Sequence, residues 1–330
     1  MNRKIVIVNN NRILSQYFEK GMKELGYDVY TIIDSYPTPF KKTFFHKCVN
    51  IFFLKILRKN TYYRNANKKY LNNFYKECFN IFFRKEKNNR FDFGIVFRAD
   101  KYDTNSLIKL HNKVDKYIAY QYDGMDGLIE SLVDKKDIFD KIYVFDYQDV
   151  FKYKDKVKLD FITNFYIKEK LNKDNDVYYD LFYLGSYSKG RLHALQQFES
   201  FSSNLIISVD QKQEDVVSQN VNITSKKYSY QESLDLMKKC KTIIDIKQKR
   251  HDGLSFRFFE AIYYSKKIIT DNLSVKKYDF YSANNILIVD YENIPLEEVK
   301  VFLEMPFKPL EPSIKEKYSL ESWLEKAFDY

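Results

Sequence analysis

Short apolar runs alternate with helix-type amphipathic segments along most of the 330-residue chain. Strand-like runs in the first half are at 4–8, 28–34, 91–99, 117–122 and 141–146. Further runs in the second half are at 180–185, 204–210, 242–246, 266–270 and 285–290. Strands that alternate with helices form parallel sheets. The pattern therefore predicts an α/β fold with two doubly wound domains.

A polar, charged stretch, IKEKLNKDND (167–176), separates the two alternations. We place the domain boundary there and expect an N-terminal domain of residues 1–168 and a C-terminal domain of residues 169–330. The chain length agrees with two domains. The last segment, YSLESWLEKAFDY (318–330), predicts a closing helix that carries Trp323, the only tryptophan.

The net charge of +10 comes from one segment. Residues 41–90 contain 14 Lys and Arg but only two acids, Glu77 and Glu86, which gives this segment a net charge of +12. The rest of the chain therefore sums to −2. We expect residues 41–90 to form a basic, aromatic, helical insertion in the first domain.

Within this insertion, residues 44–59 read FFHKCVNIFFLKILRK. A helix over this range would place the four basic residues on about a third of its circumference, namely Lys47, Lys55, Arg58 and Lys59. Such a segment can lie on an anionic membrane. Alternatively, its aromatic residues pack under the N-terminal sheet. Nucleic-acid binding is a third interpretation of a basic, aromatic patch, but no recognised motif accompanies it, so we expect no nucleic-acid partner.

The cysteines and the N-terminus indicate the compartment. Cys48, Cys78 and Cys240 are far apart and form no CxxC pattern, which argues against a metal site or a disulfide framework. The opening MNRKIVIVNN lacks the long apolar region of a signal peptide, and no apolar run reaches the roughly 18 residues of a spanning helix. We expect a cytoplasmic protein that touches a membrane only peripherally, and no metal cofactor.

The first candidate site is KQKRHDGLSFRFFEAI (247–262), which lies between two strand-like runs. Ser255 is a suitable helix N-cap, which puts Arg257 in the first turn and Glu260 one turn further on. Basic side chains such as Lys247 at a helix N-terminus suit a diphosphate, and a carboxylate beyond them suits ribose hydroxyls. The alternative is a solvated basic loop capped by serine.

The second candidate site is LFYLGSYSKGRL (181–192). We expect Gly185 and Ser186 to form a tight turn after a strand, where glycine permits close approach of a phosphate. Lys189 and Arg191 then supply charge at the start of a helix. The stretch matches neither common phosphate-binding glycine motif, and it is also compatible with a plain strand–helix turn.

The third candidate site is YIAYQYDGMDGL (117–128). Asp123 follows a strand, where a carboxylate is well placed as a general base. We expect Asp126 to cap the short helix that follows.

Five blocks of the chain resemble one family in their order along the sequence. They are YQYDGMD, FDKIYVFDYQDV, YYDLFYLGSYSKGR, GLSFRFFEAIYYSKKIITDN and YDFYSANNILIVD. Together they resemble bacterial glycosyltransferases of GT-B architecture, in particular the capsular and O-antigen (lipopolysaccharide) branch related to the CgeB-like glycosyltransferases. The resemblance spans most of the chain. It implies two Rossmann-like domains that face across a cleft, the first binding the acceptor and the second the nucleotide-sugar donor.

The resemblance also implies an activity and a set of site residues. Many retaining enzymes of this architecture carry a Glu–x7–Glu motif, and Asp252 and Glu260 have that spacing here, with Asp in the first position. The implied reaction is metal-independent transfer of a sugar from a nucleotide-sugar to a saccharide acceptor, either free or lipid-linked, in surface-polysaccharide biosynthesis. The implied donor-binding residues are Gly185, Ser186, Lys189, Arg191, Lys247, Asp252, Gly253, Ser255 and Glu260. Asp123, as base or acceptor-positioning group, and Arg257 are the implied catalytic residues.

Two other functions remain open at this stage. One is a nucleotide-sugar epimerase or hydrolase of the same fold, which would need no saccharide acceptor. The other is a non-catalytic nucleotide-sugar or membrane-binding partner.

Overall fold

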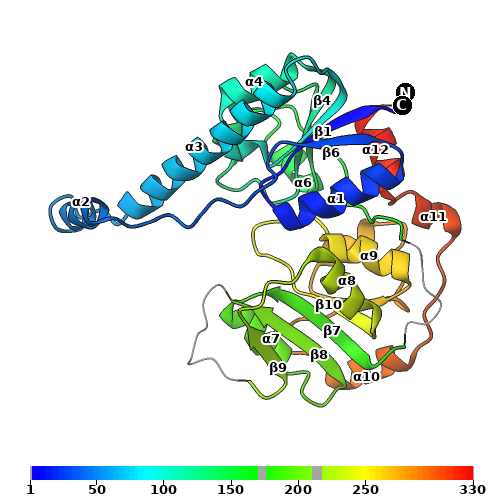
Figure 1. Cartoon of the computed structure of the whole chain (residues 1–330). Coiled ribbons are helices and arrows are strands. Elements are labelled where there is room, and N and C mark those ends of the chain that lie inside the picture. Colours follow the sequence, from blue (N-terminus) through cyan, green and yellow to red (C-terminus); the bar gives the residue numbers. More distant parts are fainter. Residues whose placement is uncertain (1, 170–175, 210–217, 330) are drawn as a thin grey trace. The chain divides into compact units, whose positions relative to one another are not determined.

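The computed structural model describes residues 2–169, 176–209 and 218–329 (Figure 1). Part of the predicted boundary stretch, 170–175, lies outside these residues, as do the last residue of the run at 204–210 and Tyr330. The described strands form two parallel sheets. This confirms the predicted α/β fold with two Rossmann-like halves.

The first sheet has the strand order β2-β1-β3-β4-β5-β6. Its strands are β1 (Lys4–Val8), β2 (Asp28–Thr31), β3 (Phe91–Phe97), β4 (Val114–Gln121), β5 (Lys141–Val144) and β6 (Asp160–Phe161). The helices of this half are α1 (Arg12–Glu24), α2 (Phe44–Lys55), α3 (Tyr62–Lys85), η1 (Ala99–Lys101), α4 (Thr104–His111), α5 (Ile129–Val133) and α6 (Tyr147–Lys152).

The second sheet has the strand order β12-β11-β10-β7-β8-β9. Its strands are β7 (Tyr179–Ser186), β8 (Ser203–Ser208), β9 (Val221–Thr224), β10 (Cys240–Asp245), β11 (Lys267–Thr270) and β12 (Ile286–Ile288). The helices are α7 (Lys189–Gln196), α8 (Tyr230–Lys238), α9 (Phe256–Tyr264), η2 (Leu273–Lys277), α10 (Leu296–Glu304), α11 (Pro312–Glu316) and the closing helix α12 (Leu320–Phe328).

The central strands are buried on both faces, as parallel strands covered by helices are. All of β1 except Lys4 is buried, and so is every residue of β3 except Asp92. α1 packs on this sheet through Phe18, whose ring stacks on Phe97 with centroids 4.8 Å apart. In the second half, Leu181, Ile244 and Ile269 belong to one core with residues of α7 and α10.

Two compact units emerge when residues are grouped by their contacts. The first comprises Met1–Gln121, Gly127–Ile142 and Lys156–Lys158; the second comprises Tyr122–Asp126, Tyr143–Asp155 and Leu159–Tyr330. Strand pairing divides the chain between β6 and β7. Grouping by contacts instead assigns short parts of residues 1–168 to the second unit.

The basic insertion consists of α2 and α3 and belongs to the first unit. One face of the C-terminal part of α3 is buried: Phe82 lies against Phe91 with ring centroids 5.7 Å apart, and Tyr75 against Tyr102 at 5.4 Å. By contrast, α2 has no buried residue. Packing of its aromatic residues under the N-terminal sheet is therefore wrong.

The predicted helix over 44–59 is also wrong at its C-terminal end. α2 ends at Lys55, and Arg58 has a left-handed backbone with φ of 50°. Arg58 and Lys59 therefore follow the helix and are not on its surface. In the part of the chain that the structure describes, every helix is too short or too polar to span a bilayer.

Candidate functional site

The loop between β10 and α9 is built around the buried carboxylate of Asp245, the last residue of β10. The Ser255 hydroxyl donates a hydrogen bond to Asp245 Oδ1 at 2.7 Å. Ser255 is the N-cap residue by position, as predicted, but its side chain does not bond to the helix backbone. The N-terminus of α9 thus has no side-chain cap, and the Phe258 N–H donates to the Ser255 carbonyl at 3.2 Å.

Arg257, in the first turn of α9, reaches the carboxyl ends of two adjacent strands. Its Nη2 donates to the carbonyl of Leu184 in β7, and its Nη1 lies 3.8 Å from Asp245 Oδ1. The guanidinium is 5.5 Å from the centroid of the Tyr183 ring. About a third of the side chain (32%) remains exposed, so a ligand at the strand ends can reach it.

Glu260 lies one turn further along α9 and is buried. The hydroxyl of Tyr230, the first residue of α8, donates to its Oε1. Burial raises the pKa of Glu260 to about 7, while Tyr230 and Arg257 act in the opposite direction. The carboxyl group therefore changes protonation near neutral pH.

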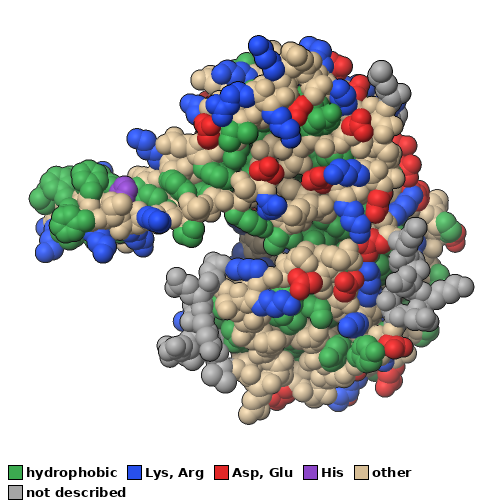
Figure 2. Space-filling model, in the orientation of Figure 1, with side chains coloured by type: hydrophobic (Ala, Val, Ile, Leu, Met, Phe, Trp, Pro, Cys, Tyr) green, Lys and Arg blue, Asp and Glu red, His purple; other side chains and the backbone are tan. Residues whose placement is uncertain are grey.

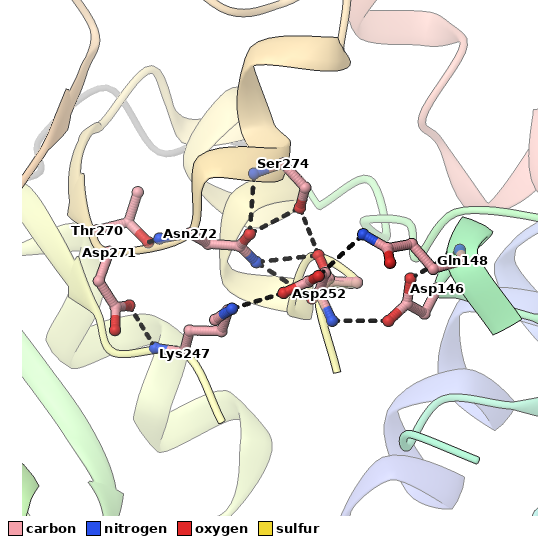
Figure 3. Close-up of polar contacts among 9 residues, drawn as sticks. Asp146, Gln148, Lys247, Asp252, Thr270, Asp271, Asn272 and Ser274 are labelled. Carbon is pink, nitrogen blue, oxygen red and sulfur yellow. Dashed lines mark hydrogen bonds and ion pairs between the residues drawn. The ribbon is translucent and has the colours of Figure 1, made fainter. Parts of the chain in front are cut away.

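Asp252 is held by side chains from three segments (Figure 3). Its Oδ1 accepts from Lys247 Nζ at 2.5 Å, and its Oδ2 accepts from Gln148 Nε2 at 3.0 Å. Its backbone N–H donates to Asp146 Oδ2 at 2.6 Å, and the Lys247 N–H donates to Asp271 Oδ1 at 2.7 Å. The predicted pair Lys247 and Asp252 is thus brought together as an ion pair.

Side chains of the segment after β11 bind the backbone of the β10–α9 loop. Asn272 Nδ2 donates to the carbonyl of Asp252 at 3.1 Å, and the Ser274 hydroxyl donates to the same carbonyl. Gly253 lies against Phe145, the residue that follows β5: a Cβ atom here would lie 2.6 Å from the Phe145 ring and 2.8 Å from its carbonyl oxygen. Glycine is therefore required by close packing at this position.

The second candidate stretch differs from its prediction. Gly185 and Ser186 are the last residues of β7 and do not form a turn. A Cβ on Gly185 would lie 2.7 Å from Cζ of Tyr183, so the glycine makes room for that ring. Lys189 is exposed at the start of α7, and Arg191 Nη1 donates to the Ser186 hydroxyl at 2.7 Å. These residues lie at the end of β7, the neighbour of β10.

The third candidate stretch contacts the β10–α9 loop through Asp123. Arg250 Nη2 lies 2.9 Å from Asp123 Oδ1. Asp126 is not a helix cap, because the N-cap of α5 is Leu128. Asp126 instead accepts from Lys152 and from the Tyr153 hydroxyl, and the Lys152 hydrogen bond lowers its pKa.

A cavity of about 440 Å³ adjoins the Asp252 loop within the second unit. Of the predicted site residues, Asp252 and Gly253 line it. Its aromatic lining residues are Tyr147, Phe161, Phe165, Tyr278, Tyr318 and Trp323, and its lysines are Lys277, Lys317 and Lys326. Rings with a few convergent polar groups are typical of small-molecule sites.

Several residues of the site escape prediction from the sequence. Asp245 ends an apolar run that the sequence does identify, but its bond to Ser255 depends on the fold. Asn272 ends the block GLSFRFFEAIYYSKKIITDN, but the sequence predicts no role for it or for Ser274, and nothing near Tyr230 in the sequence signals its contact with Glu260. Among residues 2–169, 176–209 and 218–329, no group of three or more His, Cys, Asp and Glu is arranged for a metal ion.

Comparison with known proteins supports the fold. No protein-family model and no curated protein sequence matches the chain. Among solved structures, an α,α-trehalose-phosphate synthase (UDP-forming) from Burkholderia xenovorans in complex with glucose-6-phosphate is 11% identical, covers 98% of each chain and has a TM-score of 0.50. AviGT4, a glycosyltransferase involved in avilamycin A biosynthesis, is 10% identical over 98% of each chain, with a TM-score of 0.49.

A third similar structure is the UDP-GlcNAc 2-epimerase of Methanocaldococcus jannaschii in complex with UDP-GlcNAc and UDP. It is 13% identical, covers 96% of this chain and 97% of its own, and has a TM-score of 0.47. Identities this low show a likeness of fold alone. The chain has the GT-B architecture, with two Rossmann-like domains.

Proposed function

We propose that the protein is a glycosyltransferase that moves a sugar from a nucleotide-sugar to a saccharide acceptor. The observation that carries the proposal is the arrangement at the start of α9. Beyond the carboxyl end of β10, helix α9 begins without a side-chain cap. Its first turn contains the partly exposed Arg257, and the buried Glu260 follows one turn later. Ligands of open α/β sheets bind at the carboxyl ends of the strands.

In this proposal the donor diphosphate binds at the N-terminus of α9 and beside Arg257. Charge develops on the diphosphate as the sugar–oxygen bond breaks, so preorganised N–H groups and a guanidinium stabilise the transition state more than the ground state. Lys189 and Arg191 at the end of β7 add positive charge. Glu260 accepts hydrogen bonds from the ribose hydroxyls. No metal ion is needed for these contacts.

We assign the transferred sugar of the donor to the cavity beside Asp252 and Gly253, two residues expected in the donor site. Its volume suits a sugar unit, its aromatic rings offer faces to sugar C–H groups, and Asp252 offers a hydrogen-bond acceptor. Asp123 acts as general base if configuration is inverted, and it positions the acceptor if configuration is retained. Either role requires its ion pair with Arg250 to open or rearrange.

The acceptor class and the pathway follow from the sequence resemblance; they and the location are part of the proposal. We propose that the acceptor belongs to capsule or O-antigen (lipopolysaccharide) biosynthesis in the CgeB-like branch. The enzyme then works in the cytoplasm, at the inner face of the membrane, where a lipid-linked saccharide is accessible.

The test is a metal-free thermal-shift panel of UDP-, GDP-, CMP- and dTDP-sugars. We expect one nucleotide class to raise the melting temperature of the wild type, and Arg257→Ala and Glu260→Ala to abolish the shift. Lys300→Ala is the matched control, because Lys300 is an exposed cation of α10 in the same unit. With a donor and acceptor in hand, Arg257→Ala should lower turnover by about 10²–10³.

The panel also separates the alternatives. No shift with any nucleotide-sugar would refute the donor site. Binding followed by nucleotide release or epimerisation without an acceptor would identify the epimerase or hydrolase. Binding that never leads to a chemical change, with any saccharide tested, would identify a non-catalytic binding partner.

A further inference from the structure

The basic insertion of residues 41–90 exposes a cluster of apolar side chains in and just after α2. Seven large apolar side chains near α2 are exposed: Phe44, Phe45, Ile51, Phe52, Leu54, Ile56 and Leu57. Phe44 is 82% exposed and Phe45 is 69% exposed. Figure 2 shows apolar side chains gathered around α2 with Lys and Arg around them. Contiguous apolar surface of this kind marks an interaction site.

α2 is held in a defined position and is not a loose end of chain. Its N-cap Thr43 accepts from the His46 N–H at 3.4 Å. His46 Nδ1 lies 2.7 Å from the Tyr62 hydroxyl at the start of α3, and Phe53 packs on the Tyr62 ring with centroids 5.3 Å apart. Contacts with α3 thus use one side of α2, and the other sides face solvent. In Figure 1, α2 lies at the end of α3 that is distant from the strands.

The charge around α2 selects the kind of partner. Lysine and arginine residues occur at 41, 42, 47, 55, 58 and 59, and there is no acid between Asp34 and Glu77. A second copy of the chain would bring like charges together, which disfavours self-association. Anionic lipid headgroups are complementary to the cations, and the boundary between headgroups and acyl chains accepts Phe, Ile and Leu side chains.

We infer that residues 41–59, with α2 at their centre, dock the protein on anionic membranes. The apolar side chains of α2 and of Ile56 and Leu57 enter the interface, and the flanking cations contact the headgroups. The docking element is thus shorter than the whole basic insertion of residues 41–90, because the C-terminal part of α3 packs on the first unit through one face. The inference goes beyond the proposed catalytic function and does not depend on it.

The chain carries a natural labelling site for the test. Cys48 in α2 is exposed, while Cys78 and Cys240 are buried. Burial raises the thiol pKa of Cys78 to about 11 and that of Cys240 to about 12, so these thiols react slowly at neutral pH. A polarity-sensitive maleimide dye therefore reports on α2 in the full, unmutated chain.

The labelled protein is mixed with vesicles of phosphatidylcholine alone and with vesicles of phosphatidylcholine and phosphatidylglycerol in equal parts. We expect binding, with a blue shift of the dye, on the anionic vesicles and much weaker binding at high salt. Unlabelled protein in a flotation assay controls for the dye.

Two variants separate the apolar and the charged contributions. Phe44→Ser combined with Phe45→Ser and Phe52→Ser should abolish binding, and Lys47→Gln with Lys55→Gln should weaken it roughly 10- to 50-fold. Matched controls are Ile108→Ser and Lys109→Gln on exposed positions of α4. Both sets change exposed side chains, so melting temperatures should stay near that of the wild type.

Three results would overturn the inference. One is no binding to the anionic vesicles. Another is binding that the α2 variants leave unchanged. The third is concentration-dependent dimerisation that the Phe44→Ser, Phe45→Ser and Phe52→Ser variant abolishes, which would assign the apolar surface to a second copy of the chain.

Discussion

Among single residues, Glu260 has the most consequential environment. Burial raises its pKa from 4.5 to about 7. A raised pKa means that the folded protein binds this proton more tightly than the unfolded chain. The stabilising contribution is therefore complete below pH 4.5 and is lost as the pH rises to about 7. Above that pH the folded protein contains a buried, ionised carboxylate.

We expect Glu260→Gln to remove this pH dependence. The amide has nearly the same shape and an oxygen that accepts from Tyr230, but it does not ionise. The unfolding free energy of the variant minus that of the wild type should rise by up to about 3 kcal/mol as the pH goes from acidic to weakly alkaline. Urea unfolding at a series of pH values measures the difference.

Asp149 supplies the control for this measurement. Burial, and then the neighbouring Asp146, raise the pKa of Asp149 to about 7 as well. Asp149→Asn should therefore remove a separate part of the same slope, and the double variant with Glu260→Gln should remove both. An unchanged slope in Glu260→Gln would show that this carboxyl group is not desolvated in solution.

Ser255 illustrates what the sequence can predict about one residue. Its position before an amphipathic run correctly predicts where α9 begins. The hydrogen-bond partner of its hydroxyl could not be predicted, because Asp245 is ten residues away and reaches Ser255 only once β10 and α9 are formed. Local preference predicts the helix boundary, whereas the lack of a side-chain cap on α9 follows from tertiary packing.

Among the elements, the β10–α9 loop is the one most restrained by its neighbours. It is tied to Gln148 by the Asp252 side chain and to Asp271, Asn272 and Ser274 by its backbone. Groups preorganised in this way need little rearrangement to act on a developing charge.

Gly253→Ala tests whether this restraint matters. The added methyl group would collide with the ring and the carbonyl of Phe145, so the loop or the segment after β5 must move. We expect a loss of about 1–3 kcal/mol of stability and a reduced thermal shift with the donor. Gly190→Ala is the matched control.

Gly190 lies in the first turn of α7, where a Cβ would meet no atom within 4 Å. Alanine there should stabilise the protein slightly, by about 0.5–1 kcal/mol, and leave donor binding intact. Equal effects of the two substitutions would contradict the restraint that we ascribe to Gly253.

The elements that the sequence predicts are those with strong apolar runs. Each of the predicted strands overlaps a strand of the structure, including β1, β3, β7 and β10. The strands β6 and β9 are not predicted, because their sequences, DF and VNIT, are not apolar runs. The edge strands β2 and β12 are also short, but they lie in apolar runs and are predicted. β6 and β9 therefore depend on pairing with the neighbouring strand more than on their own residues.

At the level of the whole molecule, the docking element and the donor site belong to different units. We expect the Phe44→Ser, Phe45→Ser and Phe52→Ser variant to keep the full thermal shift with the donor. Its turnover should fall on an acceptor embedded in anionic vesicles and stay unchanged on a soluble acceptor. Rates with the two acceptor forms, measured in parallel, provide the comparison.

An equal fall in turnover on both acceptors would indicate instead that α2 contributes to the chemistry or to folding of the first unit. The α4 variant Ile108→Ser, tested in the same way, guards against an effect of any added serine. The sequence predicts the basic, aromatic character of this segment correctly. Its degree of exposure could not be foreseen, because the same apolar pattern is compatible with burial under a sheet.

Trp323 gives the molecule an optical probe of its own. The indole N–H donates to the carbonyl of Thr163 at 2.9 Å, and the ring lies beside Phe165 in the wall of the cavity. As the only tryptophan, it is the sole source of indole emission, and it belongs to the second unit. Fluorescence therefore follows the melting of that half alone, while circular dichroism follows both halves. The same emission also senses any molecule that enters the cavity beside it.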